Sequence, residues 1–292
     1  MGMRTIIVLA SSGLLLAGCG GTTTGSGLAV VAAENVYGDI AQQIGGTHVH
    51  VTSILSDPNA DPHLFEPGSS NGLAVATAKV VIQNGLGYDA FMTKLENAAP
   101  NAKRSVLTIA NVLGVHGRDA NPHLWYDVPA LGRIASAISG ALERADPAHS
   151  SAYRAGLARF NATLAPLRRE VAHIRTSFGG SPVAYTEPVP GYLIDAAGLK
   201  NLAPSSFTRP IEEGTEPPPQ AVAAMNALMT QKNVKVLLYN GQAVSPITSR
   251  VRAAAARAHI PIVGVTETLP PHTTFQQWQL SQALQLAAAL TR

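Results

Sequence analysis

The middle of the chain, from Val128 to about Ser177, places Ala, Leu and Arg at helical spacing and contains no run typical of a strand. This pattern is broken mainly near Asp146 and Pro147. On both sides of it, apolar β-rich runs alternate with helix-length amphipathic segments, which is typical of βα units around parallel sheets. Because a helical segment of this length is unusual in a globular domain, the sequence predicts two α/β lobes with a long helical stretch between them.

The alternation also predicts the elements of each lobe. The first lobe, residues 28–127, is expected to hold strands at 28–32, 49–54 and 79–83 and a helix at 36–44. The second lobe, residues 178–292, is expected to hold strands at 183–185, 234–239 and 261–265 and helices near 220–231, 245–258 and 275–290. Residues 128–177 are the predicted linking backbone helix. No internal repeat at a fixed period is visible.

The N-terminus predicts export. One arginine precedes an almost unbroken apolar run from Thr5 to Leu16, which is too short to span about 30 Å of hydrocarbon, so residues 1–18 are predicted to be a signal peptide. Cys19 matches the bacterial lipoprotein pattern, in which this cysteine carries the lipid, and residues 19–27 then form a flexible tether. The alternative is an ordinary secretory signal with a chance cysteine, although a free thiol is unfavourable in an oxidising compartment.

The composition narrows the class of protein. An apolar content of 46% describes a compact body, and there is no second stretch of about twenty apolar residues that would span a membrane. The net charge is only +3 and the basic residues are scattered, so nucleic-acid binding is not expected. Cys19 is the only cysteine, which leaves none for a disulfide or a thiolate metal site in the folded part. We expect a protein anchored through Cys19 at the outer face of the cytoplasmic membrane or in the periplasm.

Four loops carry the polar residues on which chemistry would depend. Ligands of open α/β sheets bind outside the carboxyl ends of the strands, so such residues are expected in the loops that follow strands. The loops contain Asp61-Pro62-His63, Asn121-Pro122-His123, Thr186-Glu187-Pro188 and Thr266-Glu267-Thr268. Proline fixes its own φ and biases the preceding residue to an extended form, which stiffens both Pro-His loops and holds each imidazole in one direction.

Two histidines and two glutamates in such loops favour a metal site. Two neutral imidazoles and two carboxylates supply four ligands and two negative charges, which balance a divalent cation. Nitrogen and oxygen donors of this kind suit Zn, Mn or Fe. Each histidine taken alone could equally be an ordinary core or surface group. The interpretation depends on all four loops lying together.

The motifs around these residues resemble a known family. Residues 61–67 read Asp-Pro-His-Leu-Phe-Glu-Pro, residues 79–85 read Lys-Val-Val-Ile-Gln-Asn-Gly, and residues 121–127 read Asn-Pro-His-Leu-Trp-Tyr-Asp. In these segments the chain resembles the zinc/manganese solute-binding family, the metal-binding subunits of bacterial ABC importers (cluster A-I type). The resemblance covers nearly the whole mature chain. It implies an α/β fold of two lobes with parallel-type central sheets joined by one long backbone helix, the metal-type periplasmic binding protein fold.

The resemblance also implies a ligand set. It assigns the first two ligands to His63 and His123, and the third to Glu187, which stands five residues before Tyr192. The fourth, a carboxylate after a late strand, corresponds best to Glu267. Glutamate there replaces the family's usual aspartate, and the His-rich acidic loop common in zinc importers is absent before the second histidine motif. Both glutamates could instead be solvated carboxylates.

Other polar residues have less specific interpretations. Glu66 could orient a ligand histidine by accepting its other N–H, or it could face water. Asp127 is similarly placed and could instead cap the long helix. Asn240 follows a strand and could line the cleft, although Asn-Gly is also an ordinary turn pair. The acidic run 212–216 could attract cations, but a solvated charged face is the better interpretation.

These expectations converge on a carrier and not on an enzyme. The resemblance implies a monomeric lipoprotein that binds one divalent transition metal ion, Zn or Mn with Fe also open, between its lobes and delivers it to the membrane subunits of an ABC permease. The alternatives are a membrane-anchored metal-dependent hydrolase and an adhesin on the same scaffold. The sequence contains no His-Glu-x-x-His, Gly-x-Ser-x-Gly or Gly-rich phosphate loop that would favour an enzyme.

Overall fold

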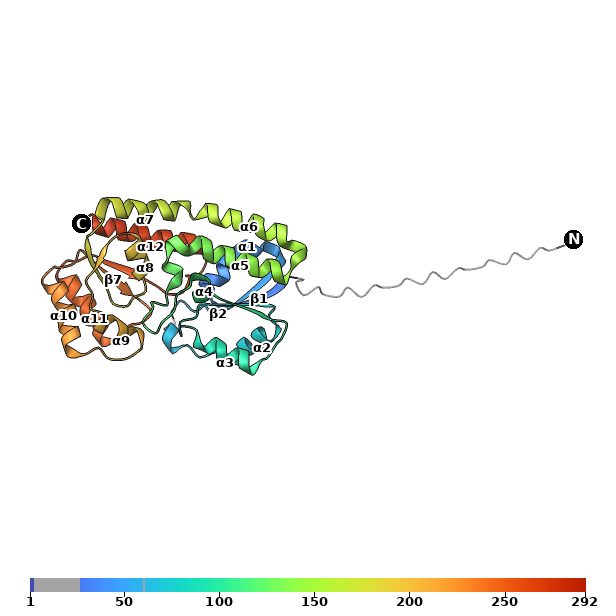
Figure 1. The fold of residues 1–292 in the computed structure, drawn as a ribbon, viewed down its shortest axis with the longest axis horizontal. Helices are drawn as coiled ribbons and strands as arrows, with labels where there is room; N and C mark the ends of the chain where they lie inside the picture. The colour runs from blue at the N-terminus through green and yellow to red at the C-terminus, as the bar shows by residue number, and fades with distance from the viewer. Residues whose placement is uncertain (3–26, 60) are drawn as a thin grey trace.

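Two parallel sheets of four strands each lie side by side beneath a layer of long helices (Figure 1). The computed structural model describes residues 1–2, 27–59 and 61–292. The predicted lipidation site Cys19 and almost all of the predicted signal peptide and tether lie outside these residues. Within the described ranges, no helix is both long and apolar enough to cross a membrane.

The first sheet has the strand order β2-β1-β3-β4, and all its strand pairs are parallel. Its strands are β1 (Leu28–Glu34), β2 (Val49–Leu55), β3 (Val80–Gln83) and β4 (Ser105–Thr108). The accompanying helices are α1 (Asn35–Gly45), α2 (Ser69–Thr77), α3 (Ala90–Ala98) and α4 (Ile109–Leu113). Most residues of β1 and β3 are buried, as expected for inner parallel strands with continuous apolar runs. We call this sheet with its helices the first lobe.

The second sheet repeats the same order as β6-β5-β7-β8, again with parallel pairs. Its strands are β5 (Pro182–Tyr185), β6 (Lys200–Asn201), β7 (Val236–Asn240) and β8 (Ile262–Val265). The helices of this second lobe are α8 (Gly191–Ala196), α9 (Ser205–Glu212), α10 (Pro219–Thr230), α11 (Pro246–Arg257) and α12 (Phe275–Leu290). In each sheet the chain goes first to one side and then to the other, which creates a switch point where ligands of open sheets bind.

The helical connection consists of α5 (Leu131–Ala145), α6 (Ser150–Thr163) and α7 (Ala165–Phe178). The break expected near Asp146 is present, because Pro147 begins a short 3-10 turn there. Only Leu164 separates α6 from α7, and its backbone stays right-handed helical, so the two helices form one long rod (Figure 1). Helix α5 packs instead against α1, α6 and the first sheet. The long helix therefore begins at Ser150 and not at Val128.

One apolar core runs through both lobes. It combines residues of α1, α5, α6, α7 and α12 with one face of each sheet, and it includes Leu124, Trp125 and Tyr126 between the lobes. Two smaller clusters lie on the opposite faces of the sheets. One joins β1 and β3 to α2 and α3, and the other joins β5 and β7 to α9, α10 and α11. The lobes thus share a core on the side of the long helices and have separate cores on the other side.

Polar contacts also tie the lobes together. The Asn35 amide donates to the carbonyl of Leu269 at 2.9 Å and accepts the backbone N–H of the same residue at 2.8 Å. The Tyr126 hydroxyl donates to the carbonyl of Thr266 at 2.6 Å. These bonds join the start of α1 and the segment before α5 to the loop that follows β8. They oppose a wide separation of the two lobes.

Candidate metal centre

The structure brings the predicted ligand residues to the facing edges of the two sheets. His63 follows β2 and His123 follows α4, whereas Glu187 follows β5 and Glu267 follows β8. The Nε2 atom of His123 lies 3.1 Å from Oε2 of Glu267, and Nε2 of His63 lies 3.6 Å from the same oxygen. Two imidazoles from the first lobe and its junction therefore meet a carboxylate of the second lobe.

Glu187 joins this group through Asn240, the last residue of β7. The Asn240 amide donates one N–H to Oε2 of Glu187 and the other, at 2.7 Å, to Oε1 of Glu267. Its oxygen accepts the backbone N–H of Gln242 at 3.0 Å, which fixes the orientation of the amide. Asn240 therefore positions both glutamates. The second oxygen of Glu187 is buried and has no hydrogen-bond partner among the described residues.

Asn121 determines which nitrogen of His123 faces Glu267. Its amide donates to the carbonyl of Pro188 at 2.7 Å, so its Oδ1 is an acceptor, and this oxygen lies 2.8 Å from Nδ1 of His123. Nδ1 must then carry the hydrogen, which leaves Nε2 facing Glu267. A Cβ on Gly191 would lie 2.7 Å from the Asn121 amide, so glycine there keeps room for it. A metal-binding histidine usually donates through one ring nitrogen and binds the ion through the other, so Nε2 of His123 is the nitrogen that could bind an ion in place of its contact with Glu267.

His63 is held on the other side of the shared carboxylate. Asp61 accepts the His63 backbone N–H at 2.9 Å, within a short 3-10 turn that begins at Pro62. The imidazole lies edge-on to the ring of Tyr88, whose hydroxyl donates to Oε2 of Glu267 at 2.9 Å. The His63 Nε2 atom is buried, and no described residue forms a hydrogen bond with it. This nitrogen is therefore available to a cation.

Burial and mutual charge dominate the electrostatics of the group. Burial lowers the pKa of His123, although its hydrogen bond with Glu267 opposes this change. Burial by itself would raise the pKa of Glu267, but the hydrogen bond and charge of His123 lower it to about 2. Burial and then the charge of Glu267 raise the pKa of Glu187 to about 8. A divalent cation between the two carboxylates would relieve their repulsion.

A cation would have to rearrange the four predicted ligand side chains in order to bind them. In the described part of the chain, no three His, Cys, Asp or Glu side chains already stand in the arrangement of a finished metal site. The donors hydrogen-bond to one another, as in the contact between His123 and Glu267. Two donors on one ion lie at most about 4.4 Å apart, because each bond measures about 2.0–2.2 Å. The separations of 3.1 and 3.6 Å between the two histidines and Glu267 already lie within this limit, whereas Glu187 is joined to the group only through Asn240.

The other predicted positions have simpler roles. Glu66 is exposed, and no hydrogen bond between described residues joins it to a histidine. Asp127 accepts the backbone N–H of Ala130 at 3.2 Å and caps the turn before α5, which is the alternative that the sequence left open. The acidic run is not a uniformly solvated face as predicted, because Glu212 at its start is largely buried at the cleft.

The sequence reasoning missed Asn121 and Tyr88 as positioning residues. Asn121 accepts the backbone N–H of His123 at 3.0 Å, two residues ahead. This spacing is that of an Asx turn, so the Asn-Pro-His motif itself contained the signal. Tyr88 lies far from the other site residues in sequence and belongs to no motif, so only the fold reveals its contact with Glu267.

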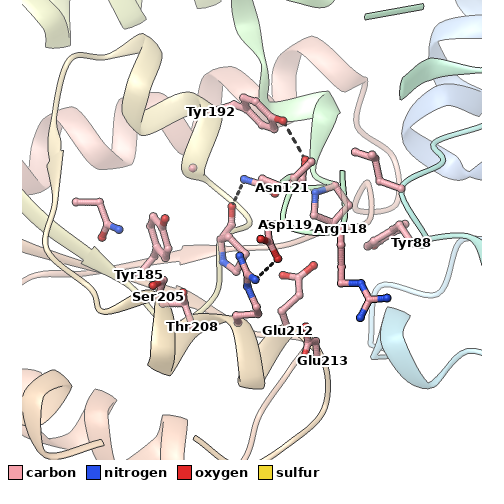
Figure 2. A pocket seen from close by; sticks show the side chains of 18 of the residues that line it. Tyr88, Arg118, Asp119, Asn121, Tyr185, Tyr192, Ser205, Thr208, Glu212 and Glu213 are labelled. Atoms are coloured by element: carbon pink, nitrogen blue, oxygen red, sulfur yellow. Dashed lines mark hydrogen bonds and ion pairs between the residues drawn. The ribbon is translucent and has the colours of Figure 1, made fainter. Parts of the chain in front are cut away.

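A cleft of about 600 Å³ lies beside the group and is lined by both lobes. Figure 2 shows the side chains that face it, among them Tyr88, Arg118, Asn121, Tyr185, Tyr192 and Glu212. The Tyr192 hydroxyl donates to the carbonyl of Asn121 at 2.9 Å, and Arg209 forms an ion pair with Asp119. The lobes therefore contact each other across the cleft, and the cleft leads to His63.

Two open parallel sheets whose switch points face a common polar cleft define a two-lobed solute-binding protein. The family model of zinc-uptake complex component A, periplasmic (ZnuA), matches residues 30–289 of this chain. The chain belongs to this family, which confirms the resemblance inferred from its motifs.

Known relatives agree with this membership. The manganese-binding lipoprotein MntA of Bacillus subtilis (strain 168) is 29% identical over 174 residues, which are 54% of this chain and 56% of that protein. The chain thus spans about half the length of this curated relative. The manganese ABC transporter substrate-binding lipoprotein PsaA of Streptococcus anginosus is 25% identical over 256 residues, 80% of each chain. The solved periplasmic zinc binding protein TroA from Treponema pallidum has a TM-score of 0.75 at 18% identity and covers 90% of this chain and 99% of its own, which shows the shared fold.

Proposed function

We propose that this protein captures a divalent transition metal ion outside the cytoplasmic membrane and delivers it to the membrane subunits of an ABC permease. The observation that carries the proposal is the convergence of His63 and His123 with Glu187 and Glu267 from the opposite lobe. Two imidazoles and two carboxylates suit Zn, Mn or Fe. Relatives named for manganese binding, zinc binding and metal ABC transport support the same function.

In this proposal the four residues are the ligands, and Asn121 and Asn240 position them. The ion would replace the hydrogen bond between His123 and Glu267 and would tie the lobes together. Release would then require one ligand to move away. The shared core and the bonds between the lobes favour such a local rearrangement over a wide clamshell motion.

The protein acts here as a monomeric carrier and not as a catalyst. Residues 28–127 and 178–292 are its two ion-binding lobes, with 128–177 as their helical connection. A lipid on Cys19 would hold the mature chain at the outer face of the cytoplasmic membrane after residues 1–18 are removed, and residues 19–27 would be its tether.

Metal analysis of the purified full chain tests the proposal. The protein is stripped with a chelator and equilibrated with Zn, Mn and Fe(II) in competition. One tightly held ion per chain is expected, and the competition ranks the three metals. A chain that retains no stoichiometric ion of any kind would contradict a metal carrier.

Substitution of Glu187 by histidine is expected to shift the metal preference toward zinc. The change replaces a carboxylate oxygen beside Asn240 with an imidazole nitrogen, which suits zinc better than manganese. We expect the ratio of zinc to manganese affinity to rise by about tenfold or more. Glu216→His, at an exposed position of the same lobe, is the matched control. An unchanged ratio in Glu187→His would remove Glu187 from the ligand set.

A further inference from the structure

Glu212 stands at the C-terminal end of α9, where the sequence shows only an acidic run. Its side chain is 13% exposed. Its Oε2 atom is buried and has no hydrogen-bond partner among the described residues. Figure 2 shows the side chain pointing from α9 toward the centre of the cleft. A buried carboxylate without a partner is unfavourable unless a cation or a proton meets it.

The other oxygen of Glu212 faces the candidate metal centre. Its Oε1 atom lies 3.9 Å from Nε2 of His123. This separation is within the limit of about 4.4 Å for two donors on one ion. The same His123 nitrogen lies 3.1 Å from Oε2 of Glu267. His123 therefore has two carboxylate neighbours, one from α9 and one from the loop after β8.

An ordinary structural role does not account for Glu212. Among the described residues, its only ion-pair partner is His123, and no lysine or arginine pairs with it. The arginine nearest to it in sequence, Arg209, pairs with Asp119 instead. Burial, and then the neighbouring carboxyl groups of Glu267 and Glu187, raise the pKa of Glu212. In the ranges that the structure describes, the carboxyl groups of Glu212, Glu187 and Glu267 thus gather beside two imidazoles, and no lysine or arginine forms an ion pair with them.

We propose that Glu212 is a fifth ligand of the transported ion and that it favours manganese over zinc. The inference rests on the proposed function, because it adds a ligand to that site. Zinc is usually satisfied by four tetrahedral donors. Manganese suits higher coordination with more oxygen donors, so a third carboxylate stabilises it more than it stabilises zinc. Glu212 can reach the ion because α9, which ends at this residue, lines the cleft.

Two substitutions of Glu212 and one of its neighbour test this assignment. Glu212→Gln removes the charge of the side chain. Glu212→Asp keeps the charge but shortens the side chain by one methylene, which moves the carboxylate away from His123. Glu213→Gln removes the charge of an exposed neighbour. The dissociation constants for Mn²⁺ and Zn²⁺ are measured on the full chain by competition with a chromophoric chelator. Thermal unfolding of each metal-free variant shows that it is folded.

Both Glu212 variants are expected to bind Mn²⁺ about tenfold or more weakly, with a smaller loss for Zn²⁺. Glu213→Gln should stay within about twofold of the wild type, as expected for a solvated charge. Mn²⁺ affinity in Glu212→Gln equal to that of Glu213→Gln would overturn the assignment. Wild-type Mn²⁺ affinity in Glu212→Asp would also overturn it, since a negative charge without a coordinating oxygen would then be sufficient. Equal losses of affinity for Mn²⁺ and Zn²⁺ would overturn it as well. A wild-type chain that holds no ion would overturn the proposed function as well, so the two failures are distinguishable.

Discussion

Replacing His63 and His123 together by alanine is expected to abolish stoichiometric metal binding. The two imidazoles are the nitrogen donors that lie 3.6 and 3.1 Å from the shared Glu267 oxygen. Loss of a residue that only orients a ligand typically lowers metal affinity by about 10–100-fold. Each lost ligand should cost at least the upper end of this range, so the loss of two should lower the affinity by more than about 10⁴-fold. The measurement is the metal content per chain together with the rise in unfolding temperature on adding metal, which depends on binding to the folded state.

The matched control for this variant replaces two exposed histidines, His50 and His173, by alanine. It removes the same number of imidazoles and should keep one ion per chain. Because His123 is fully buried, circular dichroism of the metal-free double variant must show a folded protein. A folded variant that still retains one ion would refute the assignment of both histidines.

The second large effect concerns stability. Trp125 is fully buried in the core that both lobes share, and its ring contacts those of Tyr37, Tyr88 and His123 edge-on. Trp125→Ala should lower the free energy of unfolding by about 3–5 kcal/mol, because it leaves a large cavity. For a protein of this size this corresponds to a fall in unfolding temperature of roughly 6–20 °C. Thermal unfolding of the metal-free chain, followed by circular dichroism, measures it.

Trp125→Phe is the control, since it keeps an aromatic ring in the same cavity and should cost less than the alanine variant. A loss below about 1 kcal/mol in Trp125→Ala would mean that this part of the core is not tightly packed. A loss confined to one of two separate transitions would show that the lobes do not share a single core.

The inner strands and two of the four edge strands, β2 and β8, could be predicted from the sequence, whereas the edge strands β4 and β6 could not. β1, β3 and β7 are mostly buried, so their apolar runs are continuous. β4 was missed because its first two residues, Ser105 and Val106, are exposed at the edge of the sheet. β6 was missed because it has only two residues. Edge strands bury less surface and therefore leave a weaker pattern.

The common strand order of the two sheets also has no counterpart in the sequence. No repeat at a fixed period is visible, yet both sheets have the order second, first, third and fourth. Apolar periodicity records which faces are buried, and many different sequences satisfy the same burial pattern. Topology can therefore repeat while the residues do not.

Some residues of the candidate site could be predicted from local sequence motifs, whereas others depend on contacts between segments that are far apart in the sequence. His63 and His123 each follow a proline in a stiff loop, so a local motif was enough to single them out. Asn240 was found by its place after a strand. Glu212 was misread because its burial depends on how α9 packs across the cleft, and nothing in an acidic run records that packing.

The core is shared by both lobes on one side of the molecule and divided between them on the other, so the two sides should differ in local stability. On the side of α6 and α7, one continuous core joins both lobes, so we expect them to unfold as a single cooperative unit. On the other side, α2 and α3 belong to one small cluster and α9 to another. Local opening costs less there, so amide hydrogens of these outer helices should exchange faster than those of the shared layer. The local motions that would let an ion enter and leave are therefore expected in the outer helices beside the cleft, while the shared core under α6 and α7 keeps the two lobes in a fixed arrangement.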